Sequence, residues 1–286
     1  WDDKGHNHPE HVGYTTVLAI PRDMEIAGYK TNHTNVLRLW DAKSPVPVDM
    51  SLYSRGEYLK AVEQQAMAEV IAKVLYPDDN HYEGKSLRLK QQYFFVSATV
   101  QSIVRKHRAQ YGTLRNFHEK HVIQINDTHP TLVIPELDVE GYSWDEAWNI
   151  VTHTVAYTNH TVLAEALERW PQGLIETLLP RIWQILKEIA ARYQRQLEQH
   201  FGGDMNKVSK MAIIWNGEVR MANLCICACY AVNGVSALHS EILKKDVFHD
   251  AYTMHPEQFK NVTNGIDHRR WLSQINPKLD ALVREC

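Results

Sequence analysis

The alternation of strand-like and helix-like segments constrains the fold of this chain more than any other feature. β-Branched and apolar residues predict strands at residues 14–20, 35–40 and 122–125. Apolar residues at helical spacing predict long helices at residues 56–75, 87–108, 179–201 and 222–245, the last of which Gly234 can break. Strands that alternate with helices predict an α/β fold, in which helices cover a sheet.

Two local motifs mark the boundaries of smaller elements. Ser143 and Glu146 match a capping box, which predicts a helix that begins there and buries its apolar face. Asn216 and Gly217 lie between two apolar runs, and this dipeptide predicts a hairpin with a type I′ turn.

Composition and charge exclude several classes of protein. With 286 residues and 44% hydrophobic content, the chain can bury a large core as one or two domains. The formal net charge of −3 argues against a nucleic-acid partner. No apolar run approaches the roughly 20 residues that span a membrane, and the N-terminus lacks a signal-peptide pattern. The chain begins at Trp1 and ends within a helical pattern at Cys286, so we expect an excised segment of a longer protein.

The four cysteines are arranged unlike a disulfide framework or a zinc site. Cys225, Cys227 and Cys229 alternate in a tight cluster, and Cys286 stands alone. We therefore expect the three clustered thiols to be small buried side chains in a reducing compartment, which favours a cytoplasmic protein.

A polar turn follows the predicted strand at 122–125. Asp127 and His129 lie in this turn, and ligands in open α/β sheets bind beyond the carboxyl ends of the strands. A carboxylate and an imidazole at this position can bind sugar hydroxyls, donate a proton or hold a metal. The alternative is a polar turn that only caps the next helix.

The stretch 156–171 is the most distinctive string in the chain. It places Asn159, His160 and Thr161 just ahead of an acidic segment rich in leucine and alanine, which we expect to be a helix. A helix start presents unpaired backbone N–H groups and a positive dipole end, which suits a polar or anionic ligand. The alternative is that His160 is structural.

Metal binding is a weaker interpretation of the histidines. His6, His8 and His11 resemble a metal tract, but no carboxylate or cysteine lies in helical or strand register with them, so we expect a solvated loop. A metal-dependent hydrolase is a separate alternative. Its ligands would come from Asp127, His129, His153, His160 and His239, which show no complete ligand set at metal-site spacing.

Several separated segments, in order along the chain, resemble the α-glucan phosphorylases (glycogen, maltodextrin and starch phosphorylases). They include Asn-Asp-Thr-His-Pro at 126–130 and Tyr-Thr-Asn-His-Thr at 157–161. The others lie at residues 37–40, 74–80, 83–90, 162–171, 231–235, 239–244, 262–266 and 269–272. Such an ordered set is far more specific than any single motif.

The resemblance implies an activity, a cofactor and a fold. Members of this family split terminal α-1,4-linked glucose from glycogen, starch or maltodextrin with orthophosphate, and release glucose 1-phosphate. They are cytoplasmic, usually homodimeric, and use pyridoxal phosphate. Their GT-B-type glycosyltransferase fold has two Rossmann-like domains. Residues 1–286 resemble the later part of the N-terminal domain, ending near the crossover to the cofactor-binding C-terminal domain.

The resemblance also assigns residue roles. His160 is the catalytic residue that it implies, with a side chain that hydrogen-bonds the sugar 6-hydroxyl and a carbonyl that faces the developing oxocarbenium ion. Substrate-binding roles fall on Asn264 at the same hydroxyl, Val235 and Thr161 at the sugar site, Asp79 and Asn80 in a mobile gate loop, Arg88 on the following helix, and Asp127 and His129 in the neighbouring pocket.

Some positions depart from the family pattern. Arg105 and Lys106 correspond to two arginines that help bind a regulatory nucleotide in animal members; with lysine here the segment resembles the bacterial-type members, and nucleotide control is not predicted. The chain is shorter after Leu137 by about a helical turn, which should cut back the helix after the strand. The cofactor lysine is absent, so this segment supplies no cofactor-binding residue.

The alternative function is a non-catalytic glucan-binding module.

Overall fold

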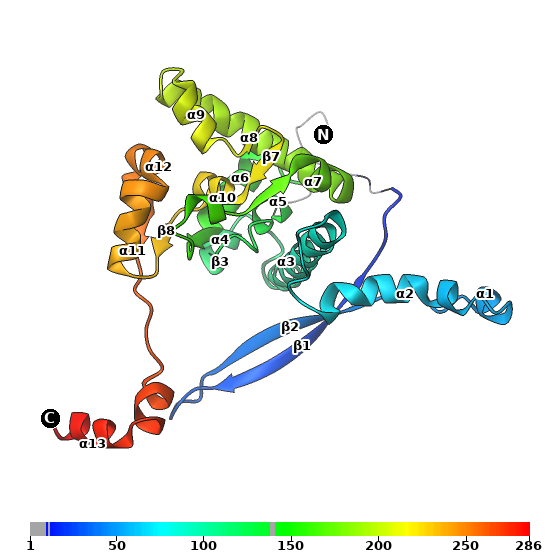
Figure 1. The fold of residues 1–286 in the computed structure, drawn as a ribbon, viewed down its shortest axis with the longest axis horizontal. Helices are drawn as coiled ribbons and strands as arrows, with labels where there is room; N and C mark the ends of the chain where they lie inside the picture. The colour runs from blue at the N-terminus through cyan, green and yellow to red at the C-terminus, as the bar shows by residue number, and fades with distance from the viewer. Residues whose placement is uncertain (1–9, 11, 138–140) are drawn as a thin grey trace.

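The fold is built around a four-stranded parallel sheet (Figure 1). The computed structural model describes residues 10, 12–137 and 141–286. The strands are β3 (Ile123–Asn126), β4 (Val155–Thr158), β8 (Val232–Gly234) and β9 (Phe259–Asn261), in the order β3-β4-β8-β9. The α/β class predicted from the sequence is therefore confirmed.

Long helices complete the core. Helix α3 (Tyr82–Tyr111) ends at Gly112, whose left-handed backbone (φ 70°) terminates the helix. Helix α8 (Pro180–His200) contributes Leu186 and Leu197 to the same buried cluster as Ile125 and Tyr157 of the sheet. The predicted helices at 87–108 and 179–201 are thus confirmed, because each carries an apolar face that the core buries.

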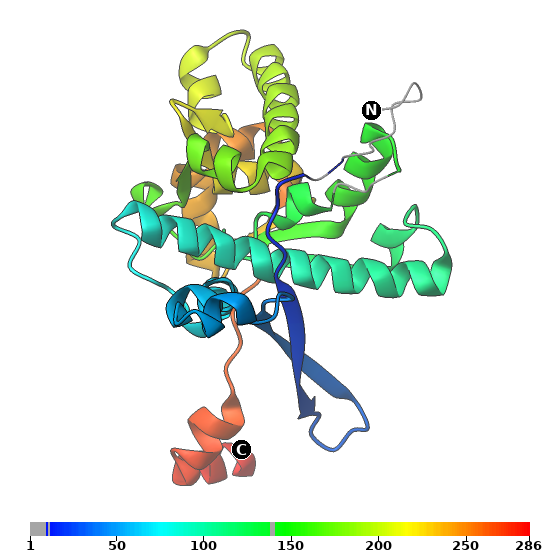
Figure 2. The same ribbon diagram turned by 90° about the vertical axis from the view of Figure 1, so that its right-hand side faces the viewer.

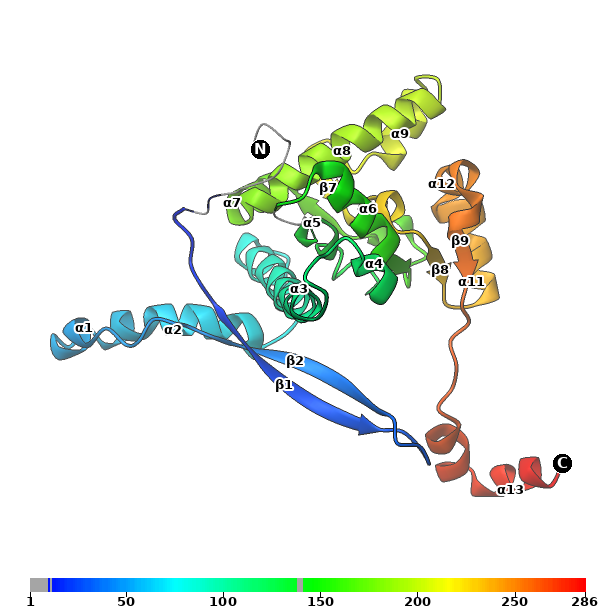
Figure 3. The same ribbon diagram turned by 180° about the vertical axis from the view of Figure 1, so that it is seen from behind.

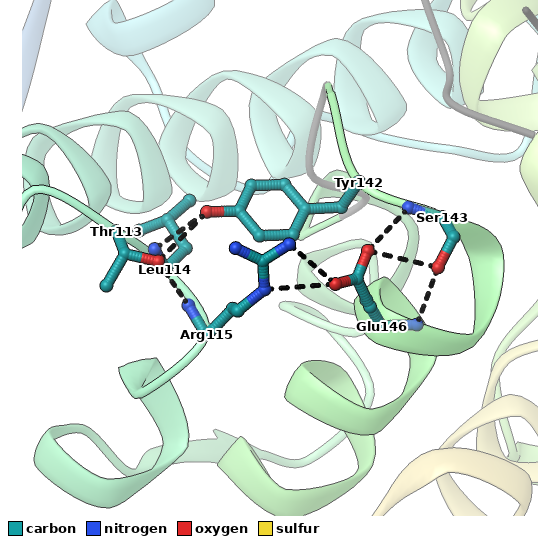
Figure 4. A network of polar contacts seen from close by, with 6 residues as sticks. All are labelled: Thr113, Leu114, Arg115, Tyr142, Ser143 and Glu146. Atoms are coloured by element: carbon teal, nitrogen blue, oxygen red, sulfur yellow. Dashed lines mark hydrogen bonds and ion pairs between the residues drawn. The ribbon is translucent and has the colours of Figure 1, made fainter. Parts of the chain in front are cut away.

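Helix α6 (Trp144–Thr154) begins at the predicted capping box. The Ser143 hydroxyl accepts the Glu146 backbone N–H, and the Glu146 carboxylate accepts the Ser143 N–H. The same carboxylate is 2.8 Å from Nη2 of Arg115 (Figure 4). Beside it, the Tyr142 hydroxyl accepts the Leu114 N–H at 2.9 Å. This network fastens the segment after α3, including α4 (Phe117–Lys120), to the start of α6.

A second, antiparallel sheet flanks the core. Strands β5 (Arg169–Pro171), β7 (Glu218–Arg220) and β6 (Ile214–Trp215) lie in the order β5-β7-β6. The predicted hairpin joins β6 to β7. Asn216 and Gly217 both have positive φ values, 50° and 78°, as a type I′ turn requires. Helices α7 (Gln172–Leu178) and α9 (Met205–Met211) pack around α8.

An antiparallel ribbon projects from the body (Figures 1 and 2). Strand β1 (Leu18–Ala27) pairs along its whole length with β2 (Thr34–Lys43), and Trp40 donates from Nε1 to the Thr99 hydroxyl of α3 at 2.9 Å. Residues 14–17 of the predicted first strand do not belong to it, because β2 offers partners only from Leu18 onward. Helices α1 (Met50–Ser54) and α2 (Tyr58–Lys73) follow, the second as predicted.

The C-terminal residues lie away from the core, beside the tip of the ribbon (Figure 3). An exposed segment after β9 leads to a π-helical turn, η4 (Arg269–Gln274), and to α13 (Pro277–Glu285). The Arg269 guanidinium lies 3.9 Å from the centre of the Tyr29 ring, which joins the two projections.

The helix predicted at 222–245 is interrupted at Gly234, where the sequence allowed a break, and only the parts on either side are helical. The segment instead forms α10 (Met221–Ala228), strand β8, α11 (Ala237–Ile242) and the π-helical turn η2 (Leu243–Val247), before α12 (His249–Met254) and the turn η3 (Pro256–Gln258). β8 is only three residues long, and it is a strand because β4 and β9 pair with it from both sides. Pairing with distant segments outweighs the local helical spacing here.

Other expectations can be compared with the structure. Cys225 and Cys229 are buried, Cys227 is partly buried, and burial raises the pKa of the Cys227 and Cys229 thiols, as expected for inert packing residues. Helix α5 (Val133–Glu136) after β3 has four residues. Among the described residues, no helix is both long and apolar enough to cross a membrane.

Candidate active site

The segments that follow β3, β4 and β8 lie side by side at the carboxyl edge of the sheet. The Asp127 N–H donates to the Thr158 carbonyl at 2.9 Å, and the Asn159 N–H donates to the Asn233 carbonyl at 3.0 Å. These bonds carry the parallel pairing one residue past the strands. The turn residues therefore keep fixed positions relative to one another, at the edge where α/β sheets bind ligands.

The Asp127 carboxylate is held by both of its oxygens. Oδ1 accepts the Thr128 N–H at 2.7 Å, and Oδ2 accepts the Thr161 hydroxyl at 3.2 Å. Asp127 has a left-handed backbone (φ 56°), a conformation that aspartate tolerates better than most residues. The structure thus joins two of the predicted site residues, Asp127 and Thr161, through a direct hydrogen bond.

Asn159 organises the segment after β4. Its side chain is fully buried, and Nδ2 donates to the Tyr157 hydroxyl at 2.8 Å. Oδ1 accepts the Thr161 N–H at 2.9 Å and the His239 ring N–H at 3.1 Å. Because each of these bonds is satisfied inside the protein, Asn159 fixes the backbone on both sides of His160 and does not contact a ligand itself.

His239 is the main residue of this region to which no role at the sugar site was assigned from the sequence. Its Nδ1 accepts the Val235 N–H at 3.2 Å, so the ring carries its proton on Nε2, the atom next to Asn159. The ring is 8% exposed, and burial, followed by the nearby charge of His160, lowers its pKa, while Asp127 opposes the shift. One indication of its position was present in the sequence, since His239 lies four residues after Val235, near the start of a helix that Ser236 caps.

The neutral His239 should make the protein less stable in acid. Its pKa in the folded protein lies below the unfolded value of 6.5, so the unfolded chain binds more protons at intermediate pH. Its contribution to stability is complete above pH 6.5 and is lost as the pH falls through the lowered folded pKa. We expect the thermal midpoint to fall below pH 6.5, and to fall less steeply in His239→Asn, whose amide oxygen still accepts an N–H but does not titrate.

Thermal melts on both sides of pH 6.5 check this expectation. Some slope should survive in His239→Asn, because the pKa of His121 is also lowered by burial and by His107. Identical slopes for the wild type and the variant would show that His239 is not held neutral by its neighbours.

His160 lies at the open rim of this cluster. Its side chain is exposed and makes no hydrogen bond or ion pair within the described residues, while its charge reaches the His239 ring. The helix expected after it is wrong. Only the three-residue turn η1 (Ala164–Ala166) forms, because the chain then pairs as β5 with β7. The helix-dipole argument for a ligand at His160 therefore does not apply.

Val235 and Asn264 meet on the same rim. The Asn264 N–H donates to the Val235 carbonyl at 3.0 Å, and the Asn264 side chain is exposed. Gly234 precedes Val235, and a Cβ on it would lie 2.7 Å from the Ser240 hydroxyl oxygen. This close approach of β8 to α11 places Val235 beside both His239 and Asn264.

A second group of predicted residues gathers at the loop before α3. Nε of Arg88 lies 3.3 Å from Asp79, and Nη2 lies 3.8 Å from Glu168, which also accepts Nε2 of Gln92 at 2.8 Å. The Arg88 guanidinium stands 5.4 Å from the centre of the Tyr76 ring. Arg88 is thus the point where the loop is attached to the body.

His129 connects the two groups. Its ring centre is 6.2 Å from that of Tyr76, and it is two residues from Asp127. Asn80 differs, since its N–H donates to the Asp78 carboxylate and its exposed side chain has no bond to either group in the described structure. The structure therefore brings Asp79, Arg88 and His129 together, and leaves the Asn80 side chain in solvent.

The residues of the strand-end cluster suit hydroxyl recognition better than cofactor or metal binding. Asp127, Asn159, Thr161, His239 and Asn264 include no lysine, so they offer no amine to an aldehyde cofactor. Across residues 10, 12–137 and 141–286, no three His, Cys, Asp or Glu side chains group as a metal site would require. His6, His8 and His11 lie outside the described residues.

Comparisons with known proteins identify the family. The model of the carbohydrate phosphorylases matches residues 1–286. Human muscle glycogen phosphorylase is 46% identical over 303 residues, which cover 98% of this chain and 36% of that protein. The muscle form of Oryctolagus cuniculus is 47% identical, covering 96% of this chain and 34% of the relative, and the brain form of Rattus norvegicus is 46% identical, covering 94% and 34%. The chain spans about a third of the length of these relatives. It belongs to the carbohydrate phosphorylase family.

Proposed function

We propose that the complete protein is an α-glucan phosphorylase, which releases glucose 1-phosphate from the ends of α-1,4-glucans with orthophosphate. The observation that carries this proposal is the ordered strand-end cluster, in which Asp127, Asn159 and His239 hold the segment around His160. Glycogen phosphorylases 46–47% identical to the chain support the same reaction.

His160 and Asn264 provide the contacts to the terminal sugar in this proposal. Both side chains are exposed at the rim, and both can hydrogen-bond a neutral hydroxyl such as the sugar 6-hydroxyl. Thr161 and Asn159 fix the backbone around His160, so the carbonyl of His160 can face the developing oxocarbenium ion. A dipole that is oriented before the reaction stabilises such a charge at little reorganisation cost. Val235 lines the sugar site.

The loop at residues 74–81 acts as the gate. Asp79 and Asn80 belong to this loop, and Arg88 ties it to Glu168 on the body. A gate that closes over the bound sugar excludes water, which favours phosphate over water as the attacking group. His129 and Asp127 line the pocket between the gate and the sugar.

Pyridoxal phosphate is the proposed cofactor of the complete protein, and its phosphate would supply proton transfer to the substrate phosphate. The strand-end cluster contains no lysine, and the resemblance to the phosphorylases assigns the cofactor lysine to the C-terminal domain, outside residues 1–286. The part played by this chain is to bind and orient the glucan and to exclude water.

Family membership supports further proposals about the complete protein. We infer that residues 1–286 form the later part of the N-terminal domain of a two-domain GT-B fold. The protein would act as a cytoplasmic homodimer. We take the protein to be a bacterial-type member, and with Lys106 beside Arg105 we do not predict nucleotide control.

A non-catalytic glucan-binding module remains the second candidate, and the cluster without a lysine favours it. The two functions differ in turnover, which can be measured on the complete protein incubated with maltodextrin and orthophosphate. Glucose 1-phosphate that appears only when orthophosphate is present supports the phosphorylase. A folded protein that binds maltodextrin but releases no glucose 1-phosphate, even with pyridoxal phosphate added, supports the binding module.

A further inference from the structure

A cavity of about 540 Å³ lies outside the strand-end cluster. One wall is formed by β5, β7 and α9, and the other by residues 245–251 of η2 and α12. None of Asp127, His160, Val235 or Asn264 lines it, whereas Glu168, the partner of Arg88, does. Its volume falls within the range of roughly 300–1,000 Å³ that is usual for small-molecule sites.

Two arginines face each other across the first wall. Arg169 of β5 and Arg220 of β7 are register partners, and like charges directly opposite in a sheet are unfavourable unless something neutralises them. Arg169 forms an ion pair with Glu218, in which Nη1 lies 3.3 Å from the carboxylate, but both side chains are partly exposed and the pair is weak. The pair therefore retains positive charge that a bound anion can neutralise.

Arg220 keeps an unused donor. Its Nη1 donates to the carbonyls of Ser209 and Lys210, while its buried Nε has no hydrogen-bond partner. Burial, followed by the charge of Arg169, lowers the pKa of Arg220. A buried guanidinium N–H without an acceptor is costly, and an anion in the cavity would satisfy it. Lys210 lines the same cavity, and its exposed ammonium makes no ion pair within the described residues.

The second wall has a different chemistry. Asp246 and Asp250 line it, and neither carboxylate makes an ion pair in the described part of the chain. Carboxylates repel a bare anion but accept hydrogen bonds from sugar hydroxyls. A ligand that suits both walls has an anionic group at one end and hydroxyls at the other.

We propose that this cavity binds a sugar phosphate. The phosphate lies against Arg169, Arg220 and Lys210, and the sugar hydroxyls donate to Asp246 and Asp250. The site lies apart from the strand-end cluster, and it does not depend on the protein being a phosphorylase.

Titration calorimetry on the complete protein tests the proposal with glucose 6-phosphate, orthophosphate and glucose as separate probes. Arg220→Gln and Lys210→Gln should each weaken glucose 6-phosphate binding about tenfold, as expected for the loss of a charge-assisted contact. Lys210 is exposed, so its variant should fold normally whether or not Arg220→Gln does. Lys207→Gln, on the same helix but outside the cavity, is the matched control and should bind like the wild type.

Asp246→Ala tests the sugar half of the site. It should weaken glucose 6-phosphate binding and leave orthophosphate binding no weaker. If Lys210→Gln binds glucose 6-phosphate as tightly as Lys207→Gln, the cavity is not the site. If orthophosphate binds as tightly as glucose 6-phosphate and Asp246→Ala changes neither, the sugar is not recognised, and the proposal is wrong.

Discussion

Alanine in place of His160 is expected to lower the rate of phosphorolysis by the complete protein about a hundredfold, the usual effect of removing one oriented contact to a transition state. The fold should be unaffected, because the His160 side chain is exposed and has no hydrogen bond within the described residues. Steady-state rates with maltodextrin and orthophosphate, together with the thermal midpoint, measure both effects.

His153→Ala provides the matched control for this substitution. His153 is also an exposed histidine, but it lies on α6, where its ring hydrogen-bonds the Asn149 carbonyl and Thr152 and lies beside the ring of His118. Its loss should leave turnover unchanged. Equal turnover in the two variants would remove the role assigned to His160.

Alanine in place of Gly84 is expected to displace the gate loop. A Cβ at this position would lie 1.7 Å from the Asp78 carbonyl oxygen, so the backbone before α3 must move. His81 would lose its bond to the Gly84 N–H, and Asp79 its pairing with Arg88. We expect a loss of about 1–3 kcal/mol in the free energy of unfolding, as for other overpacked sites, and a clear fall in turnover.

Gly173→Ala separates this effect from helix propensity. Gly173 is also in the first turn of a helix, α7, and a Cβ there meets nothing within 4 Å. Alanine should therefore leave stability unchanged or raise it by up to about 1 kcal/mol. Denaturant unfolding measures the free energy of unfolding of both variants. If Gly84→Ala is as stable and active as Gly173→Ala, the loop is not clamped at Gly84.

Elements with strong local signals were predictable from the sequence. The apolar periodicity of α3 and α8 spans many turns, and the capping box at Ser143 and the turn at 216–217 each determine their geometry within four residues. In these segments local preference and tertiary packing agree.

The strands β5 and β8 were not predictable because distant segments define them. β8 has three residues and is a strand through its pairing with β4 and β9, and β5 replaces the helix expected after His160 through its pairing with β7. Periodicity cannot distinguish a short buried strand from a piece of buried helix.

The candidate site likewise contains residues that could be placed from the sequence and residues that could not. Asp127 and His129 could be placed because ligands bind at strand ends, a rule that needs only the chain order. The supporting residues could not, since His239 reaches Asn159 across 80 positions and Glu168 reaches Gln92 across 76. The link from His129 through Tyr76 to the gate likewise exists only in the folded chain.

The most direct test of the central claim, that the strand-end cluster holds the terminal sugar, is a comparison of glucose 1-phosphate with 6-deoxyglucose 1-phosphate in the synthesis direction. The rates of the wild type and of His160→Ala with each donor form a double-mutant cycle. We predict that removing the 6-hydroxyl costs the wild type at least about tenfold and costs His160→Ala clearly less, because one of the two proposed partners of that hydroxyl is already gone and only Asn264 remains. The same loss in both proteins would contradict the account and place the sugar elsewhere.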